Sequence, residues 1–383
     1  MIDILVISHA CFTAINRNVY HLFQESGWKL EIVVPQSLPF PSGTRKADHP
    51  QAKDPVIHFL NLEGTNPRIY QFNGLEEILL QTNPKIIILD NDPVSRMALQ
   101  LGKWAKKNKR RLYCISNDNL PLDIFSNISR RGLKALPATI VKRALLIKTR
   151  KLLSGVFVIN TDGQEIFQKE GYRNVVHMPL GFDPAFFFPD ENSRTEIRVK
   201  FGLKGMVIAY FGRLTPEKGI HVLISALQQL KQYEWQLMMD EFDEYASGFH
   251  QQINKQIQDA GLGDRIVYVK PSHFEIPAYM NAADIVVVPS IRIPQWKEQY
   301  GRVAAEAMAC GKHVIASETG ALPELLGGYG DLFEEGNQDQ LRNTIKSILE
   351  GRRWNKSNSE IADYAKEELS IQKQYQVMEA VLK

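Results

Sequence analysis

The chain has 383 residues, a formal net charge of +3 and 44% hydrophobic residues. This length favours two domains with separate cores over one, and no run approaches the ~18 uninterrupted apolar residues of a membrane-spanning helix. Cys11, Cys114 and Cys310 are too few and too scattered for a disulfide framework or a metal cluster, so we expect buried free thiols and a reducing cytoplasm.

Short apolar runs alternate with helical patterns in the amino-terminal half. Strands are predicted at 2–8, 30–34, 86–90, 112–116 and 155–160, and helices at about 15–26, 94–107 and 161–170. Strands separated by helices are typical of a doubly wound parallel sheet. The first residues contain an acid and no basic lead, so we interpret them as a first strand and not as a signal peptide.

A basic segment lies in this half of the chain. Between Ile124 and Asn160 there is no acid, whereas eight basic residues occur, namely Arg130, Arg131, Lys134, Lys142, Arg143, Lys148, Arg150 and Lys151. Leucine and isoleucine interleave with them at roughly helical spacing. Two interpretations stay open: a segment at 126–152 that binds an anionic membrane surface, and a solvated helix that covers the sheet. Nucleic acid is not expected, because no aromatic residue interleaves the basic positions after Phe125.

Two cations follow the first strand of the carboxyl-terminal half. The proline-rich run 178–189 suits a hinge between rigid domains. A strand is then predicted at 206–211, followed by Arg213 and, five residues on, Lys218 at the start of a helix. A planar arginine fork and a lysine point charge can converge on one diphosphate. The alternative is that Arg213 and Lys218 are ordinary solvated surface residues. Their position directly after a buried strand favours phosphate binding.

A strand–loop–helix–strand unit occupies residues 284–326. An apolar run at 285–288 predicts a strand buried on both faces, and a polar loop after it carries Glu298. A helix is predicted over 301–309 with Glu306 inside it, and a second strand over 313–316. In parallel sheets of this kind, ligands bind beyond the carboxyl ends of the strands.

This unit predicts a pocket for a sugar nucleotide at the start of the helix. Glu298 and Glu306 can both face it, and the backbone amides of Tyr300, Gly301 and Arg302 would point into it. Unpaired amides and the helix dipole favour a phosphate. A carboxylate beside an anion needs a hydroxyl-rich ligand between them. We therefore expect a hexose at Glu298, a diphosphate at the amides and a ribose at Glu306.

Four stretches resemble the sugar-donor signature of retaining glycosyltransferases of the GT-B fold. They are Gly212–Gly219, Glu298–Gly301, Glu306–Gly311 and Gly320–Leu325. The group that they resemble is glycosyl transferases group 1, the large family that builds polysaccharides, glycolipids and sucrose from nucleotide sugars. The signature is long and ordered, so chance agreement is not expected.

The resemblance implies an α/β fold of two Rossmann-like doubly wound domains that face a cleft, with a carboxyl-terminal helix returning to the amino-terminal domain. The expected domains are 1–182 together with the helix 358–383, for the acceptor, and 183–357, for the nucleotide sugar. The last helix is predicted as one piece, from about 360 to 382, because apolar residues recur along it at helical spacing.

The resemblance also implies roles for particular residues. Arg213, Lys218 and Glu298 are the expected catalytic residues. The expected contacts to the nucleotide sugar are Gly212, Tyr300, Gly301, Arg302, Glu306 and Lys270, the last of which lies where relatives pack against the nucleobase. No metal and no cofactor beyond the nucleotide sugar is expected, because enzymes of this fold work without metal.

The amino-terminal half departs from the family pattern at two places. Relatives carry a Gly-Gly pair after the first strand, where this chain has polar residues, so Asn16 and Arg17 either reach the cleft or cap the first helix. Relatives also place a histidine near 117–119, where this chain has Asn117 and Asn119 instead. We take His9, Asn16, Asn117 and Asn119 as candidate contacts to the acceptor or the sugar.

Two acidic stretches allow other interpretations. Asp90-Asn91-Asp92 matches the Asp-x-Asp metal pair of the other common glycosyltransferase fold, but we favour Asp92 as a helix cap before Pro93. Residues 240–244 are acidic where relatives have a Gly-x-Gly turn. The acidic stretch either reshapes the sugar subsite or forms a surface loop.

The predicted function is retaining transfer of a hexose-type sugar from a UDP- or GDP-sugar to an acceptor sugar or lipid-linked glycan, in surface polysaccharide or glycolipid assembly. The alternatives are a sugar-nucleotide epimerase of the same fold and a catalytically silent nucleotide-binding regulator. We expect a cytoplasmic protein, or one bound peripherally to the inner face of the plasma membrane.

Overall fold

The computed structural model describes residues 1–40, 43–64, 66–241, 248–352 and 354–383. The chain forms two compact units. The first unit comprises Met1–Gly181 and Ile371–Lys383, and the second comprises Phe182–Ser370. Each unit has its own parallel sheet, as predicted.

Seven described strands form the sheet of the first unit, in the order β11-β10-β9-β8-β1-β2-β5. All neighbours in it are parallel. The strands are β1 (Ile4–Ser8), β2 (Leu30–Pro35), β5 (Val56–Leu60), β8 (Ile86–Asp90), β9 (Arg111–Ser116), β10 (Gly155–Val158) and β11 (Val175–His177). Two small antiparallel pairs lie outside it, β3 (Ser37–Phe40) with β4 (Gly43–Lys46) and β6 (Leu62–Glu63) with β7 (Gln71–Phe72).

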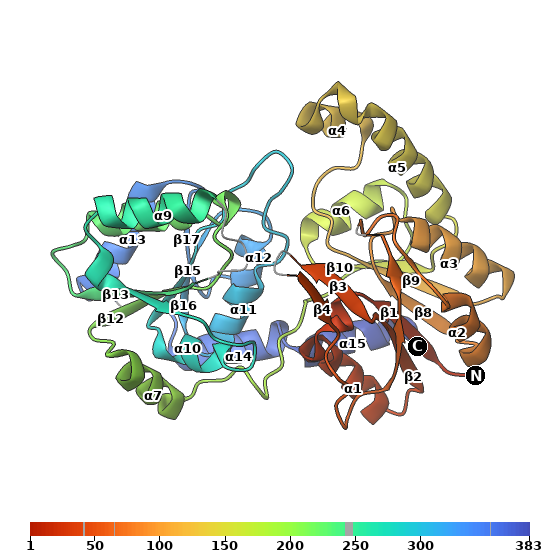
Figure 1. Ribbon diagram of the computed structural model, residues 1–383, viewed down its shortest axis with the longest axis horizontal. Helices are drawn as coiled ribbons and strands as arrows, with labels where there is room; N and C mark the ends of the chain where they lie inside the picture. Colours follow the sequence, from red (N-terminus) through yellow and green to blue (C-terminus); the bar gives the residue numbers. More distant parts are fainter. Residues whose placement is uncertain (41–42, 65, 242–247, 353) are drawn as a thin grey trace. The chain divides into compact units, whose positions relative to one another are not determined.

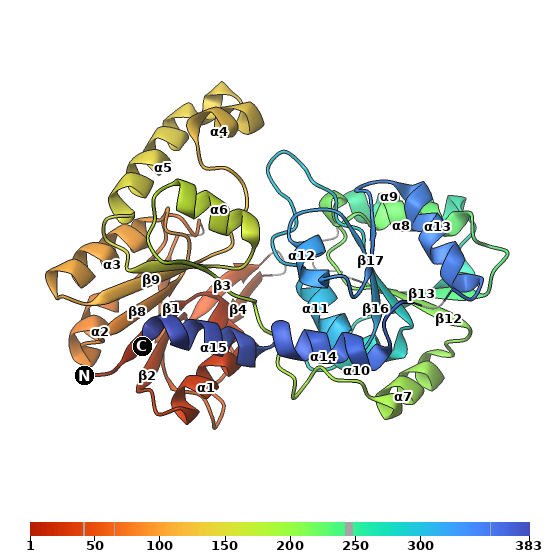
Figure 2. The same ribbon diagram turned by 180° about the vertical axis from the view of Figure 1, so that it is seen from behind.

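Helices cover both faces of this sheet. Figures 1 and 2 show α1 (Asn18–Glu25) and α15 (Ile371–Leu382) together on one face. The opposite face carries α2 (Leu75–Thr82), α3 (Arg96–Lys107), α5 (Leu136–Thr149) and α6 (Thr161–Lys169), whose apolar residues pack on the strands. Helix α4 (Ile124–Arg131) packs on α5, and α4 with the adjoining amino-terminal end of α5 projects away from this sheet (Figure 1).

Six described strands form the parallel sheet of the second unit, in the order β14-β13-β12-β15-β16-β17. They are β12 (Met206–Tyr210), β13 (Trp235–Asp240), β14 (Ile266–Val269), β15 (Ile285–Val288), β16 (His313–Ser317) and β17 (Asp331–Phe333). The central strands β12, β15 and β16 are almost entirely buried, because helices cover both faces of a parallel sheet.

One face of this sheet carries α8 (Ile220–Gln228), α9 (Gly248–Asp259) and α13 (Gln338–Leu349) (Figure 2). The other face carries α7 (Glu191–Phe201), α10 (Ile276–Ala282), α11 (Arg302–Ala309) and α14 (Asn358–Glu368) (Figure 1). A short helix, α12 (Leu322–Leu326), follows β16 and contacts α11.

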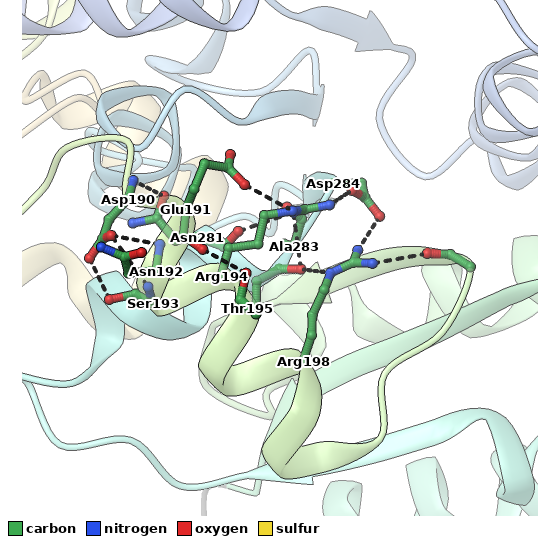
Figure 3. A network of polar contacts seen from close by, with 12 residues as sticks. Asp190, Glu191, Asn192, Ser193, Arg194, Thr195, Arg198, Asn281, Ala283 and Asp284 are labelled. Carbon is green, nitrogen blue, oxygen red and sulfur yellow. Dashed lines mark hydrogen bonds and ion pairs between the residues drawn. The ribbon is translucent and has the colours of Figure 1, made fainter.

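A network of ion pairs holds the amino ends of the central strands β12 and β15 (Figure 3). Asp284 precedes β15 and binds Arg194 and Arg198, both on α7. Its Oδ2 also accepts a hydrogen bond from the backbone nitrogen of Val207 in β12, at 2.7 Å. Asp190 caps the start of α7 by accepting from the amide of Asn192 at 3.0 Å. This network fixes the sheet at the end opposite to the predicted site.

Two predicted helices are wrong in detail. The single helix predicted over 360–382 is two, because the carbonyl of Leu369 accepts from the amide of Phe182 at 3.2 Å and Ser370 pairs with Phe182 as a β-bridge. Helix α14 therefore packs on α11 in the second unit, and only α15 joins the first unit. The helix predicted at 15–26 begins as a 3-10 turn over Ala14–Arg17 and becomes α-helical at Asn18.

The predicted cap at Asp92 is also wrong. Helix α3 begins three residues after Pro93, and its cap is Ser95, whose side chain accepts from the amide of Ala98. The Asp92 carboxylate instead accepts a hydrogen bond from Ser116 Oγ at 2.5 Å. A contact across two neighbouring strands has replaced the local capping interaction.

Candidate functional site

The candidate site lies where the strand order of the second unit reverses. The chain runs from β12 outward through β13 and β14, and returns to the other side of β12 as β15, β16 and β17. Such a switch point leaves an opening beyond the carboxyl ends of the two central strands. The loop 211–219 follows β12 and the loop 289–301 follows β15, and β12 and β15 are paired neighbours.

Lys218 and Glu298 form an ion pair between these two loops. Lys218 Nζ lies 2.7 Å from Glu298 Oε2, and only 9% of the Glu298 side chain is exposed. The same carboxylate oxygen accepts from Ser290 Oγ at 2.8 Å. Lys218 Nζ also lies 4.8 Å from the centroid of the Trp296 ring, a cation–π arrangement. The lysine is thus held in one place by a carboxylate and an aromatic face.

Both helices that start from these loops are capped by glycine. Gly219 precedes α8 with φ +71°, and Gly301 precedes α11 with φ +93°, a left-handed conformation that favours glycine. Neither helix start has a side-chain cap. The first amides of both helices therefore have no capping side chain in front of them, which makes each helix start suitable for an anion.

Backbone contacts at two glycines join the site loops. A Cβ atom at Gly219 would lie 1.7 Å from the carbonyl oxygen of Pro289, and one at Gly320 would lie 1.9 Å from that of Glu298. The Glu298 carbonyl accepts from the amide of Ala321 at 3.1 Å. The positions of Lys218 and Glu298 thus depend on backbone approaches that only glycine permits.

Glu306 lies half-buried on α11, one and a half turns from its start. Desolvation by burial raises the pKa of its carboxyl group to about 7, although the charge of Arg302 opposes this shift. Within the described part of the chain, the carboxyl group has no hydrogen-bond partner. Such a group can accept hydrogen bonds from ligand hydroxyls without giving up an existing bond.

The other residues predicted to bind the nucleotide sugar differ in their surroundings. Arg213 is exposed, and its carbonyl accepts from Tyr210 Oη at 2.9 Å. Gly212 is half-buried, Tyr300 is buried, and Arg302 is exposed at the start of α11. Lys270 is exposed after β14, the edge strand, which is separated from β12 by β13. Of the predicted acidic stretch, Asp240 ends β13, and 242–244 lie outside the described residues.

In the first unit, the loop after β1 is organised by internal bonds. His9 Nδ1 lies 3.1 Å from the carbonyl oxygen of Asp90 and 3.3 Å from Tyr70 Oη. Asn16 Nδ2 donates to the carbonyl of Ala10 at 2.7 Å. Arg17 is fully buried and ion-paired with Asp54 at 2.9 Å. Arg17 therefore stabilises this loop from inside and is not available to a ligand.

The residues after β9 separate into exposed and buried positions. Asn117 is exposed, whereas Asn119 is buried. Between them, Asp118 forms an ion pair with Arg68 at 3.4 Å, and Arg68 Nη2 also lies 3.8 Å from Asp92. Sequence reasoning did not assign a role to Arg68, because it lies in a loop far from these aspartates in the chain.

Sequence reasoning also missed supporting residues in the second unit. Ser290 binds Glu298, and the Ser290 carbonyl accepts from Ser317 Oγ at 2.5 Å. Trp296 lies beneath Lys218. The only sequence signal for this support was the glycine at 219 and at 320 within the two motifs, since a glycine between a strand and a helix often marks a close backbone approach.

Comparison with known proteins gives two kinds of similarity. Residues 193–368 match the family model described as glycosyl transferases group 1. The lipopolysaccharide 1,2-N-acetylglucosaminetransferase of Salmonella typhimurium is 32% identical over 188 residues, which are 46% of each chain. The GDP-mannose-dependent alpha-(1-6)-phosphatidylinositol monomannoside mannosyltransferase of Mycolicibacterium smegmatis is 28% identical over 182 residues, 45% of this chain and 46% of that protein. The chain thus matches about half the length of these curated relatives.

A crystal structure matches the whole chain. The Anabaena protein HepE in complex with UDP and glucose aligns with a TM-score of 0.72 and 20% identity, covering 100% of this chain and 99% of that one. This similarity shows the same two-unit fold.

Proposed function

Because residues 193–368 make the chain a member of the glycosyl transferases group 1 family, we propose that it moves a hexose-type sugar from a UDP- or GDP-sugar to an acceptor hydroxyl. Its GT-B fold agrees with this proposal. The observation that carries it is the pairing of Lys218 with Glu298 at 2.7 Å beside two glycine-capped helix starts. Lys218, the helix amides and Glu298 thus lie together beyond the carboxyl ends of β12 and β15, where the strand order reverses.

In the proposed mechanism, Arg213, Lys218 and the amides near Gly301 stabilise the charge that grows on the leaving diphosphate. Glu298 orients the sugar through its hydroxyls, and Glu306 binds the ribose. The bond between the anomeric carbon and the phosphate oxygen breaks as the acceptor oxygen bonds the same face of that carbon. The acceptor proton passes to the departing phosphate oxygen. Because the acceptor attacks the face that the phosphate leaves, the configuration is retained. Two cations and the amides supply the charge, so this mechanism is independent of a metal.

The proposal is tested by incubating the purified protein with UDP-, GDP- and ADP-sugars and measuring the release of free nucleoside diphosphate. We expect slow hydrolysis of one class of donor, which becomes faster when a glycan acceptor is added. NMR of the product should show the anomeric configuration of the donor. Conversion to an isomeric nucleotide sugar without nucleotide release would indicate an epimerase, and binding without turnover would indicate a silent regulator.

Replacing Glu306 by glutamine is expected to raise the donor KM about tenfold with little change in kcat. The reason is that hydrogen bonds to a charged group contribute roughly 1.5–3 kcal/mol, and ribose contacts change little in the transition state. Since burial raises the pKa of Glu306 to about 7, donor KM of the unchanged protein should rise as the pH falls from 8 to 6. Glu306→Gln should lack that dependence. A normal KM with a collapsed kcat would contradict the ribose role.

The acceptor is proposed to be a sugar or a lipid-linked glycan in surface polysaccharide or glycolipid assembly. The names of two relatives refer to lipopolysaccharide and to phosphatidylinositol monomannoside, which supports a lipid-linked acceptor. Among the described residues, no helix has the length and apolar character needed to cross a bilayer. A lipid-linked acceptor lies in a membrane, so transfer to it needs a protein surface that contacts the membrane.

The segment 126–152, together with Phe125, offers such a surface. Large apolar side chains are exposed along α4, α5 and the 3-10 turn Leu133–Ala135 between them, namely Phe125, Leu133, Leu136, Ile140, Val141 and Ile147. Leu133 is 76% exposed and Val141 is 60% exposed, so neither covers the sheet. Exposed Arg131, Lys134 and Lys148 accompany them. We propose that this apolar and basic surface binds an anionic membrane, where each basic residue contributes about 1 kcal/mol.

Vesicle flotation tests this surface. The protein should rise with phosphatidylglycerol vesicles at low salt, be released at high salt, and not bind neutral vesicles. The double variant Leu133→Glu/Val141→Glu should no longer rise. Leu80→Glu is the matched control, since Leu80 is 70% exposed on α2, away from the basic segment. Equal flotation of the double variant and the control would leave a soluble acceptor as the better account.

A further inference from the structure

A second group of charges lies in the first unit, beyond the carboxyl ends of β8 and β9. Arg68 Nη2 contacts Asp118 at 3.4 Å and Asp92 at 3.8 Å, and Asp92 in turn accepts from Ser116 Oγ. Asn91 holds the loop that carries Arg68, because its Nδ2 donates to the carbonyl of Pro67 at 2.7 Å. The position of Arg68 is therefore fixed from both strands.

Lys142 of α5 interacts electrostatically with the same group of charges. Desolvation and the charges of Arg68 and Arg131 together lower the pKa of its amine to about 8, against the opposing effect of Asp118. Within the residues that the structure describes, no carboxylate lies within ion-pair distance of Lys142. Lys142 is thus a half-buried cation among cations, without a counter-ion in contact.

Arg68 and Asp118 also have side-chain atoms that form no hydrogen bond. Arg68 Nη1 and Asp118 Oδ2 are buried and have no hydrogen-bond partner. Burial and the nearby charge of Asp92 raise the pKa of the Asp118 carboxyl group to about 7, so this group repels an anion less than an ordinary aspartate does. An arginine fork with a free nitrogen, beside an unpaired lysine, is suited to the oxygens of a phosphate.

We propose that Lys142, Arg68 and Arg131 form a subsite for a phosphate group carried by the acceptor. This inference deepens the transferase function proposed above and rests on it. The subsite lies at the carboxyl edge of the sheet, where ligands of doubly wound folds bind. Asp118 Oδ2 accepts a hydrogen bond from a hydroxyl of the same acceptor. The acceptor is therefore a phosphorylated sugar or polyol, either free or as a lipid headgroup.

Direct binding without any nucleotide sugar tests the subsite. Glycerol 3-phosphate is titrated by calorimetry into the Lys218→Met protein, in which the proposed diphosphate site has lost its lysine. We expect saturable binding that is weakened about tenfold or more by adding Lys142→Met, because a charged hydrogen bond is lost. Lys103→Met is the matched control, since Lys103 is an exposed lysine on the neighbouring helix α3. Binding equal in the Lys142→Met and Lys103→Met proteins would overturn the proposal.

A second arm separates the two sources of the phosphate. Vesicles that contain phosphatidic acid are compared with phosphatidylglycerol vesicles of equal surface charge. A preference for phosphatidic acid that disappears with Lys142→Met, without binding of glycerol 3-phosphate, supports a lipid headgroup. Binding of glycerol 3-phosphate supports a free phosphorylated acceptor. If the Lys142→Met protein keeps both its preference for phosphatidic acid and its binding of glycerol 3-phosphate, the subsite proposal is wrong.

A merely structural lysine would respond differently. Removing an unpaired half-buried cation should leave Tm unchanged or raise it, so a lowered Tm in Lys142→Met would count against the subsite. Phosphate binding is measured without a sugar donor. If the protein binds phosphate but transfers no sugar, only the proposed transferase function is wrong. If the Lys142→Met protein still transfers sugar and binds phosphate as before, only the subsite proposal is wrong.

Discussion

Replacing Arg213 by methionine is expected to lower kcat about 10²–10³-fold, the cost of removing one preorganised group that stabilises transition-state charge. Arg213 is exposed after β12, and the backbone of its loop is held by Tyr210. The variant should therefore fold normally, with an unchanged Tm. Initial rates at saturating donor, together with thermal unfolding, measure both quantities.

Lys218→Met should lose as much activity, but it should also lower Tm. The Glu298 carboxylate is almost fully buried and would lose the cation that lies 2.7 Å from it, while it keeps the hydrogen bond from Ser290. A buried charge that loses its counter-ion is destabilising. Lys231→Met is the control for both variants, because Lys231 is exposed before β13, at the opposite end of the sheet. Near-normal turnover of Arg213→Met or Lys218→Met would show that the diphosphate assignment is wrong.

Gly320→Ala is expected to reduce activity at least about 10²-fold, although the added group is only a methyl. The new Cβ would lie 1.9 Å from the carbonyl oxygen of Glu298. No flexible side chain can yield there, so the backbone of Glu298 or of the loop after β16 must move. Misplacement of a catalytic group by about 1 Å costs on this order. Unfolding should also occur at a lower temperature, since the residue has φ +55°.

Gly336→Ala is the matched control for this variant. Gly336 also has a positive φ, +76°, but a Cβ atom there would meet no atom within 4 Å. It should lower Tm through backbone strain of about 1–2 kcal/mol and leave kcat unchanged. If Gly320→Ala kept the activity of Gly336→Ala, the proposal that this close approach positions the Glu298 carboxylate for catalysis would be wrong.

The layout of both sheets was predictable because it depends on local pattern. Residues 86–89 and 285–288 are continuous apolar runs, which are typical of parallel strands buried on both faces. Residue spacing after a strand also indicated Arg213 with Lys218 in one segment, and Glu298 with Glu306 in another. Each of these inferences used residues within one segment, where sequence separation and spatial separation are similar.

Errors arose where a distant segment competed with a local signal. The apolar spacing over 360–382 continues without interruption, but pairing of Phe182 with the backbone at 369–370 divides the helix. Asp92 and Pro93 form a good local cap, but Ser116 on the neighbouring strand takes the carboxylate. In both cases a hydrogen bond between segments far apart in the chain decided the outcome.

The sequence by itself indicated which residues of the second unit are candidates for the chemistry, because their order and spacing are a property of the chain. Only the tertiary structure decided how they meet. Lys218 and Glu298 are 80 residues apart and lie 2.7 Å from each other since β12 and β15 are neighbours in the sheet. The same holds for Arg68 and Asp118, 50 residues apart, and for the absence of a partner at Lys142 within the described chain. Whether a charge is paired depends on what the fold brings beside it, which residue spacing alone does not specify.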